Sequence, residues 1–296
     1  MRLLVLGGTH HVGRAAVEAG VARGDEVTIV NRGLSPNPSS RGARALRADR
    51  TRPGDLAAAL VDDGPWDVVL DTWSGAPNVV QESASVLHGR AQRYGYVSSI
   101  SVYQGPLPLG LDESSPTVAA APDSADSHDY AAAKRGAELA VLGSWGPLQT
   151  LVARPGLIVG PYEVTGRLPW WLRRLDAGGR VLAPGPPDRR LQLIDGRDLA
   201  RWMLHAAHRG LAGTFNTVSG PGHATMGSLL DAGLNATRSD AQLCWITPQE
   251  VQSVGLKPWT ELPIWLPPTG ESAGMHAADV SAALAKACSA DPSPRR

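Results

Sequence analysis

The sequence has little lysine and no excess of charge of either sign. Its 28 Lys and Arg residues balance 28 Asp and Glu residues, so the formal net charge at pH 7 is zero. A balanced chain lacks the broad charged surface that attracts nucleic acids and membranes, and we expect neither as a partner. Lysine occurs only at Lys134, Lys257 and Lys286, so the position of each lysine is informative.

Cysteine and long apolar runs are also scarce. The two cysteines, Cys244 and Cys288, do not have the spacing of metal ligands and suit a reduced, cytoplasmic protein. His205 and His208 lack a third ligand, so we expect a surface or packing role for them and no metal site. The apolar start at Leu3 is too short for a signal peptide, and no segment approaches the roughly 20 apolar residues of a membrane span.

What the sequence does contain is a regular alternation of apolar runs and alanine-rich stretches. Strand-like runs occupy residues 2–7, 26–32, 66–72, 93–100 and 148–160, and helix-like stretches occupy residues 12–23, 54–64, 78–92 and 129–143. This alternation predicts βαβ units, and continuous apolar runs are typical of parallel strands that are buried on both faces. We therefore expect an α/β fold, a doubly wound parallel (Rossmann) sheet with a smaller C-terminal substrate-binding lobe.

A change of texture after Gly160 predicts the domain organisation. Residues 161–189 are rich in Pro, Gly and Trp and indicate a less regular region, whereas residues 191–210 predict a strand and a helix that rejoin the sheet. We expect a dinucleotide-binding domain over residues 1–160, with 190–220 returning to it. The lobe would then comprise 161–189 and 221–288, followed by a frayed tail at 289–296.

The first predicted strand runs into a glycine-bearing turn, "GGTHHVG" at residues 7–13. Gly7, Gly8 and Gly13 would provide the tight turn, the close backbone approach to a pyrophosphate and the helix packing of a dinucleotide loop. The N-terminus of the following helix attracts negative charge. His10 stands where such loops usually have their middle glycine. The turn therefore predicts a dinucleotide site, with an ordinary strand-to-helix turn as the alternative.

The end of the second strand indicates which dinucleotide is bound. An acidic residue about twenty positions after the loop accepts hydrogen bonds from the ribose of NAD. This chain has Asn31 and Arg32 there instead, and a guanidinium suits the 2′-phosphate of NADP. We expect NADP in preference to NAD. A solvent-exposed arginine that binds no ligand is the alternative.

The most specific chemical signal is "HDYAAAK" at residues 128–134. Tyr130 and Lys134 are four residues apart on a predicted helix, so they project from one face. Upstream, Ser98, Ser99 and Ser101 follow the fifth strand, at the sheet edge where α/β proteins bind ligands. An ammonium group favours the phenolate of a nearby tyrosine, and a serine hydroxyl polarises a carbonyl group. Together these residues predict hydride transfer.

In their order along the chain, these motifs resemble the extended branch of the short-chain dehydrogenase/reductase superfamily, whose members are NAD-dependent epimerase/dehydratase-like proteins. The resemblance covers nearly the whole chain and includes "NRG" at 31–33, "VSSISVY" at 97–103, "RPGLIVGP" at 154–161, "DGRDLA" at 195–200 and "GTFNTVSG" at 213–220. It implies that the catalytic residues are Ser99, Tyr130 and Lys134.

The resemblance also implies a set of cofactor contacts. These would come from Gly7, Gly8, Thr9, His10, Val12, Gly13, Asn31, Arg32, Asp49, Arg50, Thr72, Tyr130, Lys134 and Pro155. Asp49 and Arg50 would lie on the adenine side. On this basis we expect an NAD(P)-dependent oxidoreductase that acts on a small carbonyl or alcohol metabolite.

Departures from the family pattern leave two other functions open. His10 and His11 replace the usual glycine and phenylalanine, as in an atypical subgroup similar to plant chloroplast stem-loop RNA-binding proteins. A nucleotide- or RNA-binding protein without turnover is therefore one alternative, although the complete Ser99, Tyr130 and Lys134 set and the zero net charge count against it.

A nucleotide-sugar epimerase is the other alternative. Sugar-nucleotide dehydratases of this family have an Asp-Glu pair after the catalytic serine or threonine, where this chain has Ile100 and Ser101. Nucleotide-sugar members usually place a diphosphate-binding arginine where this chain has Leu191, although Arg189 and Arg190 are adjacent and a one-residue slip would restore it. These differences favour a small carbonyl metabolite.

The substrate side of the site is less well determined. Its candidate residues are Ser101, His128, Trp170 and Trp171. The two tryptophans could equally form the core of the lobe. The other tryptophans of the C-terminal region, for which we expect packing roles, are Trp245, Trp259 and Trp265. A homodimer is left open.

Overall fold

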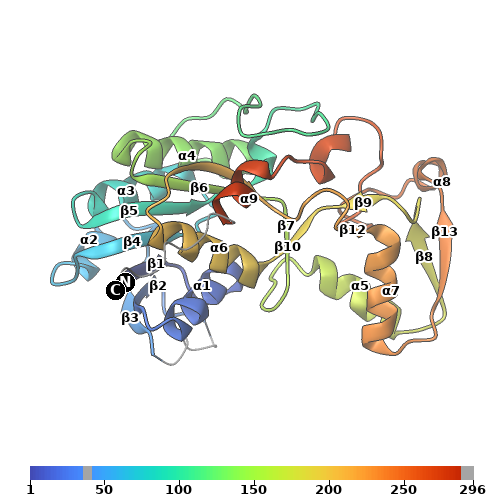
Figure 1. Ribbon diagram of the computed structural model, residues 1–296, viewed down its shortest axis with the longest axis horizontal. Helices are drawn as coiled ribbons and strands as arrows, with labels where there is room; N and C mark the ends of the chain where they lie inside the picture. The colour runs from blue at the N-terminus through green and yellow to red at the C-terminus, as the bar shows by residue number, and fades with distance from the viewer. Residues whose placement is uncertain (36–41, 288–296) are drawn as a thin grey trace, which may run out of the picture.

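In residues 1–35 and 42–287, which the computed structural model describes, seven parallel strands form a central sheet (Figure 1). The strand order is β11-β6-β5-β4-β1-β2-β3. These strands are β1 (Arg2–Leu6), β2 (Glu26–Asn31), β3 (Arg44–Arg47), β4 (Trp66–Asp71), β5 (Ala91–Val97), β6 (Thr150–Pro155) and β11 (Gly213–Thr217). The sheet confirms the expected α/β, doubly wound parallel fold.

Side chains that alternate along each strand give the sheet a core on both faces. Leu3 and Val5 of β1 pack on one face with α1 and α6, whereas Leu4 and Leu6 pack on the other with α2, α3 and α4. The helices on the two faces are α1 (His11–Ala22), α6 (Gly196–His208), α2 (Asp55–Ala59), α3 (Pro77–Leu87) and α4 (Tyr130–Trp145). Burial on both faces is the physical reason for the continuous apolar runs of the sequence.

Several of the predicted elements have different boundaries in the structure. The helix expected over 78–92 ends at Leu87, and β5 begins soon afterwards. The strand expected over 148–160 is divided into β6 and β7 (Leu157–Val159). β7 leaves the main sheet and pairs with β10 (Leu193–Asp195) instead. This second pair lies where the sheet domain passes into the lobe (Figure 1).

The lobe is more regular than the Pro- and Gly-rich sequence suggested. Its elements are α5 (Arg167–Asp176), β8 (Arg180–Pro184), β9 (Arg190–Leu191), β12 (Ala224–Thr225), α7 (Met226–Thr237), β13 (Gln242–Ile246) and α8 (Pro248–Ser253). β8 pairs with β13, and β9 pairs with β12. Its core includes the fully buried side chains of Trp171, Leu230 and Trp265.

The end of the described chain returns to the sheet domain. β11 pairs with β6, as expected for the segment 190–220. After the short helix η2 (Ala273–His276), α9 (Ser281–Ala287) packs against β11 and α6, although this segment was expected in the lobe. Cys288 and the tail predicted at 289–296 lie outside the described residues. Within the described ranges, no helix is both long and apolar enough to cross a membrane.

Candidate active site

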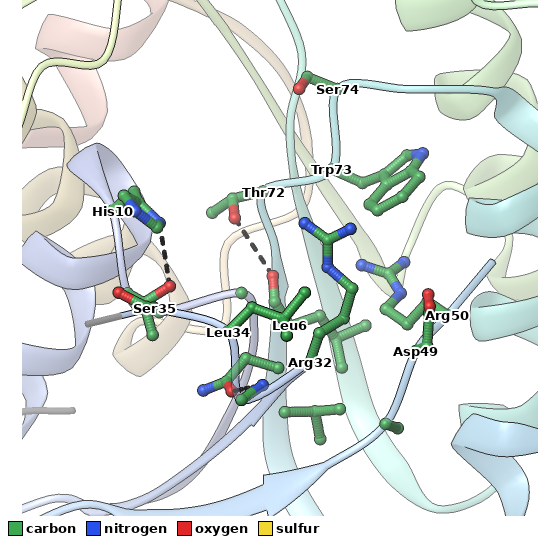
Figure 2. A pocket seen from close by; sticks show the side chains of 17 residues that line it. Leu6, His10, Arg32, Leu34, Ser35, Asp49, Arg50, Thr72, Trp73 and Ser74 are labelled. Carbon is green, nitrogen blue, oxygen red and sulfur yellow. Dashed lines mark hydrogen bonds between the residues drawn. The ribbon is translucent and has the colours of Figure 1, made fainter. Parts of the chain in front are cut away.

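Two adjoining cavities open at the carboxyl edge of the sheet. The strand register aligns these ends, because Leu6 of β1 pairs with both Val30 of β2 and Asp71 of β4. The first cavity, of about 480 Å³, lies over the ends of these three strands (Figure 2). The second, also of about 480 Å³, lies between α4 and the lobe. His10 and Thr72 line both cavities, so a single extended ligand could occupy the two.

The backbone of the glycine loop packs so tightly that a side chain on Gly7 or Gly13 would not fit. Gly7 and Gly8 have φ values of +120° and +93°, which L-residues rarely adopt. A Cβ atom on Gly13 would lie 2.8 Å from the backbone nitrogen of Gly8, and one on Gly7 would lie 2.6 Å from Thr72 Oγ1. Such a cradle fits a dinucleotide, whose pyrophosphate needs the backbone to approach closely.

The N-terminus of α1 points into this cradle, with a histidine as its cap residue. The imidazole of His10 lies 3.0 Å from Thr9 Oγ1 and makes no capping hydrogen bond to the helix. The amide groups of the first turn are therefore left for an anion. His11 has a φ of +41°, and burial lowers the pKa of its imidazole. Of the two histidines, His10 is the one that lies at the junction of the cavities.

Arg32 extends into the first cavity beneath Trp73, beside Asp49 (Figure 2). Its side chain is exposed, and the preceding Asn31 is occupied by a local turn in which its Oδ1 accepts a hydrogen bond from the Gly33 amide at 2.7 Å. An exposed guanidinium at this place is available to an anionic ligand.

Arg50 reaches the same cavity as part of a buried ion pair. Its guanidinium donates two hydrogen bonds to the Asp71 carboxylate, at 2.8 and 2.6 Å, and a third to Ser83 at 2.9 Å. Burial opposes ionisation of Asp71, but the charge and hydrogen bonds of Arg50, together with a hydrogen bond from Tyr94, keep its pKa below the usual value. The adenine-side contact expected of Arg50 would therefore come from a guanidinium whose charge Asp71 already balances.

The expected catalytic residues meet in the second cavity. Ser99 Oγ accepts a hydrogen bond from the Ser101 amide and donates one to Ser101 Oγ, both at 3.1 Å. Tyr130 is the first residue of α4, where Asp129 caps the helix by accepting from the Ala132 amide at 3.0 Å. These local bonds hold the serine and the tyrosine at the cavity wall.

Lys134 lines the same cavity as Tyr130, and its ammonium group is held by the backbone of two other segments. Its Nζ donates hydrogen bonds to the backbone oxygens of Trp73 and Val97, at 2.6 and 2.7 Å. Burial lowers the pKa of Lys134 to about 8. Burial also raises the pKa of Tyr130, and the groups that oppose this rise are Ser99 and Arg167. An effect of Lys134 on the ionisation of the Tyr130 phenol stays a prediction.

The cofactor-side residues that the sequence predicted all line one cavity or the other, except Pro155. Pro155 is buried at the end of β6, next to Gly156, which does line the second cavity. On the substrate side, Ser101 lines the cavity, whereas His128 is exposed and does not. Trp171 is only 1% exposed and donates to the Pro263 oxygen at 2.7 Å within the lobe core.

Trp170 packs edge-on against Trp171 and is 37% exposed, outside the cavity. The expected substrate roles of both tryptophans are therefore corrected. Adjacent helical residues point in different directions, and only the packing of α5 decides which of them is buried.

Several residues that line the second cavity were not predicted from the sequence, and three of them come from segments far apart in the chain. Arg167 begins α5, Trp259 comes from a loop of the lobe, and His276 ends η2. Trp259 was expected only to pack, and it does lie against the lobe core as well as the cavity. No local motif marks these positions, because two of them lie more than 90 residues after Arg167 and only the fold brings them together.

His276 is buried and neutral. It is 2% exposed, its Nδ1 accepts from the Gln192 amide at 3.2 Å, and its Nε2 lies 3.1 Å from the Ile264 oxygen. Burial lowers the pKa of His276 to about 4, from the ordinary value of 6.5. The side chain supports the cavity wall and is not positioned as an acid at neutral pH.

We expect His276 to make the fold less stable as the pH falls. The unfolded chain takes up this proton near pH 6.5 and the folded chain only near pH 4, so the stability contribution is present above pH 6.5 and is lost below it. Between pH 7 and 5 the loss should be about 2 kcal/mol in the free energy of unfolding. His276→Asn keeps a side-chain acceptor for the Gln192 amide, but asparagine does not titrate. The free energy of unfolding of this variant should be lower than that of the wild type at pH 7, and the difference should become smaller as the pH falls. Urea unfolding at pH 7, 6 and 5 measures this, and a constant deficit would contradict it.

The geometry defines a Rossmann-type α/β protein with serine, tyrosine and lysine gathered at the carboxyl edge of its sheet. A sequence model of the NAD dependent epimerase/dehydratase family matches residues 3–217. The chain belongs to this family. Comparison with curated proteins finds no match. Within the described residues, no group of three or more His, Cys, Asp or Glu side chains could hold a metal ion.

Solved structures share the fold at low sequence identity. WbmG of Bordetella bronchiseptica, in complex with NAD and UDP, is 19% identical with a TM-score of 0.66, over 84% of this chain and 82% of that one. UDP-N-acetylglucosamine 4-epimerase of Bacillus cereus is 18% identical with a TM-score of 0.65, over 84% and 87%. WbmH of B. bronchiseptica, in complex with NAD⁺, is 17% identical with a TM-score of 0.67, over 94% and 96%.

Proposed function

We propose that this protein transfers hydride between a nicotinamide cofactor and a substrate carbon that carries a hydroxyl or carbonyl group. The observation that carries the proposal is the meeting of Ser99, Tyr130 and Lys134 in a cavity that adjoins the glycine cradle. A protein that only bound nucleotides would need the cradle but not this second cavity with a proton donor in its wall.

In the direction of reduction, the carbonyl oxygen would lie against Ser99 and Tyr130. Ser99 would donate a hydrogen bond to that oxygen, and Tyr130 would pass its proton to it as the hydride reaches the carbon, so that the carbonyl becomes an alcohol. The nicotinamide, when bound, supplies that hydride. Lys134 lines the same cavity and would hold the ribose next to the ring.

For the substrate, we propose a small carbonyl or alcohol metabolite. Leu191, at the position of the usual diphosphate-binding arginine, is fully buried in the lobe core. Arg189 donates a 3.0 Å hydrogen bond to the Leu266 oxygen, and Arg190 lies in β9 opposite Thr225 of β12. Neither neighbour lines the second cavity, which supports a substrate without a nucleotide.

Nucleotide-sugar epimerisation is the second candidate. It uses the same hydride transfer, run forward and back on one substrate, and it is favoured by the family name and by structural relatives such as the Bacillus cereus 4-epimerase. Both candidates use Ser99 and Tyr130. They differ in their substrate and in whether the reaction consumes the cofactor.

Cofactor binding is the first requirement of the proposed function, and turnover then separates the enzyme from a protein that only binds nucleotides. Titration with NADH and NADPH, followed by nicotinamide fluorescence, should show saturable binding of at least one, and binding of neither would overturn the proposal. Carbonyl compounds that oxidise the bound cofactor would then support the reductase. Thermal stabilisation by UDP- or dTDP-sugars, with interconversion and no net oxidation, would support the epimerase instead.

We expect Arg32 to select NADPH. Its guanidinium is exposed in the first cavity, where a 2′-phosphate would gain from a charged partner. Arg32→Ala should weaken NADPH by about tenfold or more and NADH much less, since one charge-assisted contact is worth about 1.5–3 kcal/mol. Calorimetry with both cofactors measures this. Equal losses for the two would remove the 2′-phosphate assignment.

A further inference from the structure

The second cavity, between α4 and the lobe, is lined by positively charged side chains and by no negatively charged ones. Arg167 and Lys134 are the Arg and Lys residues among those that line it, and none of the lining residues is Asp or Glu. Two of the three ammonium donors of Lys134 are directed at backbone oxygens, which leaves at most one for a ligand. Arg167 is different. Among residues 1–35 and 42–287, no carboxylate lies within ion-pairing distance of its guanidinium.

The guanidinium of Arg167 is held by an aromatic ring. Its central carbon lies 4.6 Å from the centroid of the Trp259 ring, the geometry of a cation–π contact. Trp259 is itself constrained, because its side chain packs against the lobe core and its backbone has a φ of +67°. A bulky residue in the left-handed region indicates that the surrounding fold imposes this conformation.

The positive charge of Arg167 destabilises the N-terminus of α5. Arg167 is the first residue of the helix, where the helix dipole disfavours a cation. Glu163 satisfies the Arg167 backbone amide, through a 2.7 Å hydrogen bond, and forms no ion pair with its side chain. Arg167 is also close enough to Tyr130 for its charge to oppose the rise that burial causes in the Tyr130 pKa. The guanidinium thus faces the same space as the reacting hydroxyl.

We propose that the substrate carries an anionic group, a carboxylate or a phosphate, and that Arg167, braced by Trp259, binds it. The inference rests on the hydride-transfer function proposed above and adds the substrate class, an acidic carbonyl or hydroxy compound. A planar guanidinium binds either anion through two parallel hydrogen bonds, which would also orient the carbonyl toward Ser99 and Tyr130.

The test compares charged and neutral forms of the same carbonyl compounds. The panel contains 2-, 3- and 4-oxo acids with their methyl esters, phosphorylated ketones with their dephosphorylated forms, and a UDP-sugar. The variants are Arg167→Met, which keeps the apolar stem, and Arg173→Met, a matched control for an exposed arginine on the same helix that does not line the cavity. Cofactor oxidation and thermal stabilisation are both measured.

We expect the wild type and Arg173→Met to prefer one class of anion over its neutral form by about 10²-fold in kcat/KM. Arg167→Met should lose that preference, chiefly through a higher KM. Preference for oxo acids would identify a carboxylate, and preference for the phosphorylated ketones or the UDP-sugar would identify a phosphate. Equal use of charged and neutral compounds by the wild type would overturn the anion site while leaving hydride transfer standing.

Thermal stabilisation separates the anion site from the redox function. If no compound is turned over but an anion stabilises the wild type and not Arg167→Met, the anion site stands and hydride transfer fails. If Arg167→Met is stabilised by the same anions to the same extent as the wild type, the assignment of Arg167 is wrong whatever the activity.

Discussion

Tyr130→Phe is expected to lower turnover by about 10²–10⁴-fold while the affinity for the cofactor changes little. The hydroxyl of Tyr130 lies at the cavity wall and is the proposed proton donor to the substrate oxygen, and loss of a general acid typically costs this much. The phenyl ring would keep the packing at the start of α4, so the change is confined to one oxygen atom.

The state of the Tyr130 hydroxyl supports a role as proton donor. Although 47% of the residue is exposed, the protein surrounds the hydroxyl enough for burial to raise its pKa above the ordinary value, with Ser99 and Arg167 opposing the rise. At neutral pH the group is therefore protonated and ready for reduction. Alcohol oxidation needs the phenolate, so its rate should increase with pH in the alkaline range, and the rate of reduction should not.

The measurement is steady-state turnover on any carbonyl compound that the wild type reduces, together with a fluorescence titration of the cofactor. Tyr162→Phe is the matched control, because Tyr162 is similarly exposed at 43% but lies outside the cavity, against Arg14. Near-wild-type turnover by Tyr130→Phe would show that another group supplies the proton.

Gly13→Ala is expected to weaken cofactor binding by about 10²-fold or more. The new Cβ would lie 2.8 Å from the Gly8 nitrogen and 3.2 Å from its Cα, both of which are backbone atoms that cannot rotate away. Either the loop or the start of α1 must move, and a displacement of about 1 Å is enough to lose that much in a well-formed site. Binding is measured by calorimetry with NADH and NADPH.

Gly143→Ala provides the control for Gly13→Ala. Gly143 also lies within a helix, α4, and a Cβ there would meet nothing within 4 Å. This variant should bind cofactor as the wild type does, and its unfolding free energy should increase by about 1 kcal/mol because alanine favours the helix over glycine. If Gly13→Ala also keeps its affinity, the glycine loop is not where the cofactor's pyrophosphate lies.

The sequence determined by itself the features that depend on local geometry. The continuous apolar runs require burial on both faces, and they correctly predicted a parallel sheet flanked by helices. Gly7, Gly8 and Gly13 marked a turn whose backbone leaves no room for side chains. The spacing of Tyr130 and Lys134 placed both on one face of a helix, and both do line the same cavity.

Tertiary structure alone decided which partners these residues have. Lys134 donates to backbone oxygens of Trp73 and Val97, which precede it by 61 and 37 residues, so these partners could not be read from its four-residue spacing from Tyr130. Arg50 lines the first cavity, where an adenine-side contact is expected of it, and only the fold brings Asp71 at the end of β4 to balance its charge.

The residues on the substrate side of the site were the hardest to predict, because their positions depend on how the lobe packs. Trp170 and Trp171 are chemically identical neighbours, and the packing of α5 buries one and exposes the other. Arg167 and Trp259 come together only because the loop that carries Trp259 folds back over the start of α5, and His276 closes the wall from a third segment. Periodicity and short motifs report the backbone's local preferences, whereas these contacts arise from the packing of segments that are far apart in the sequence.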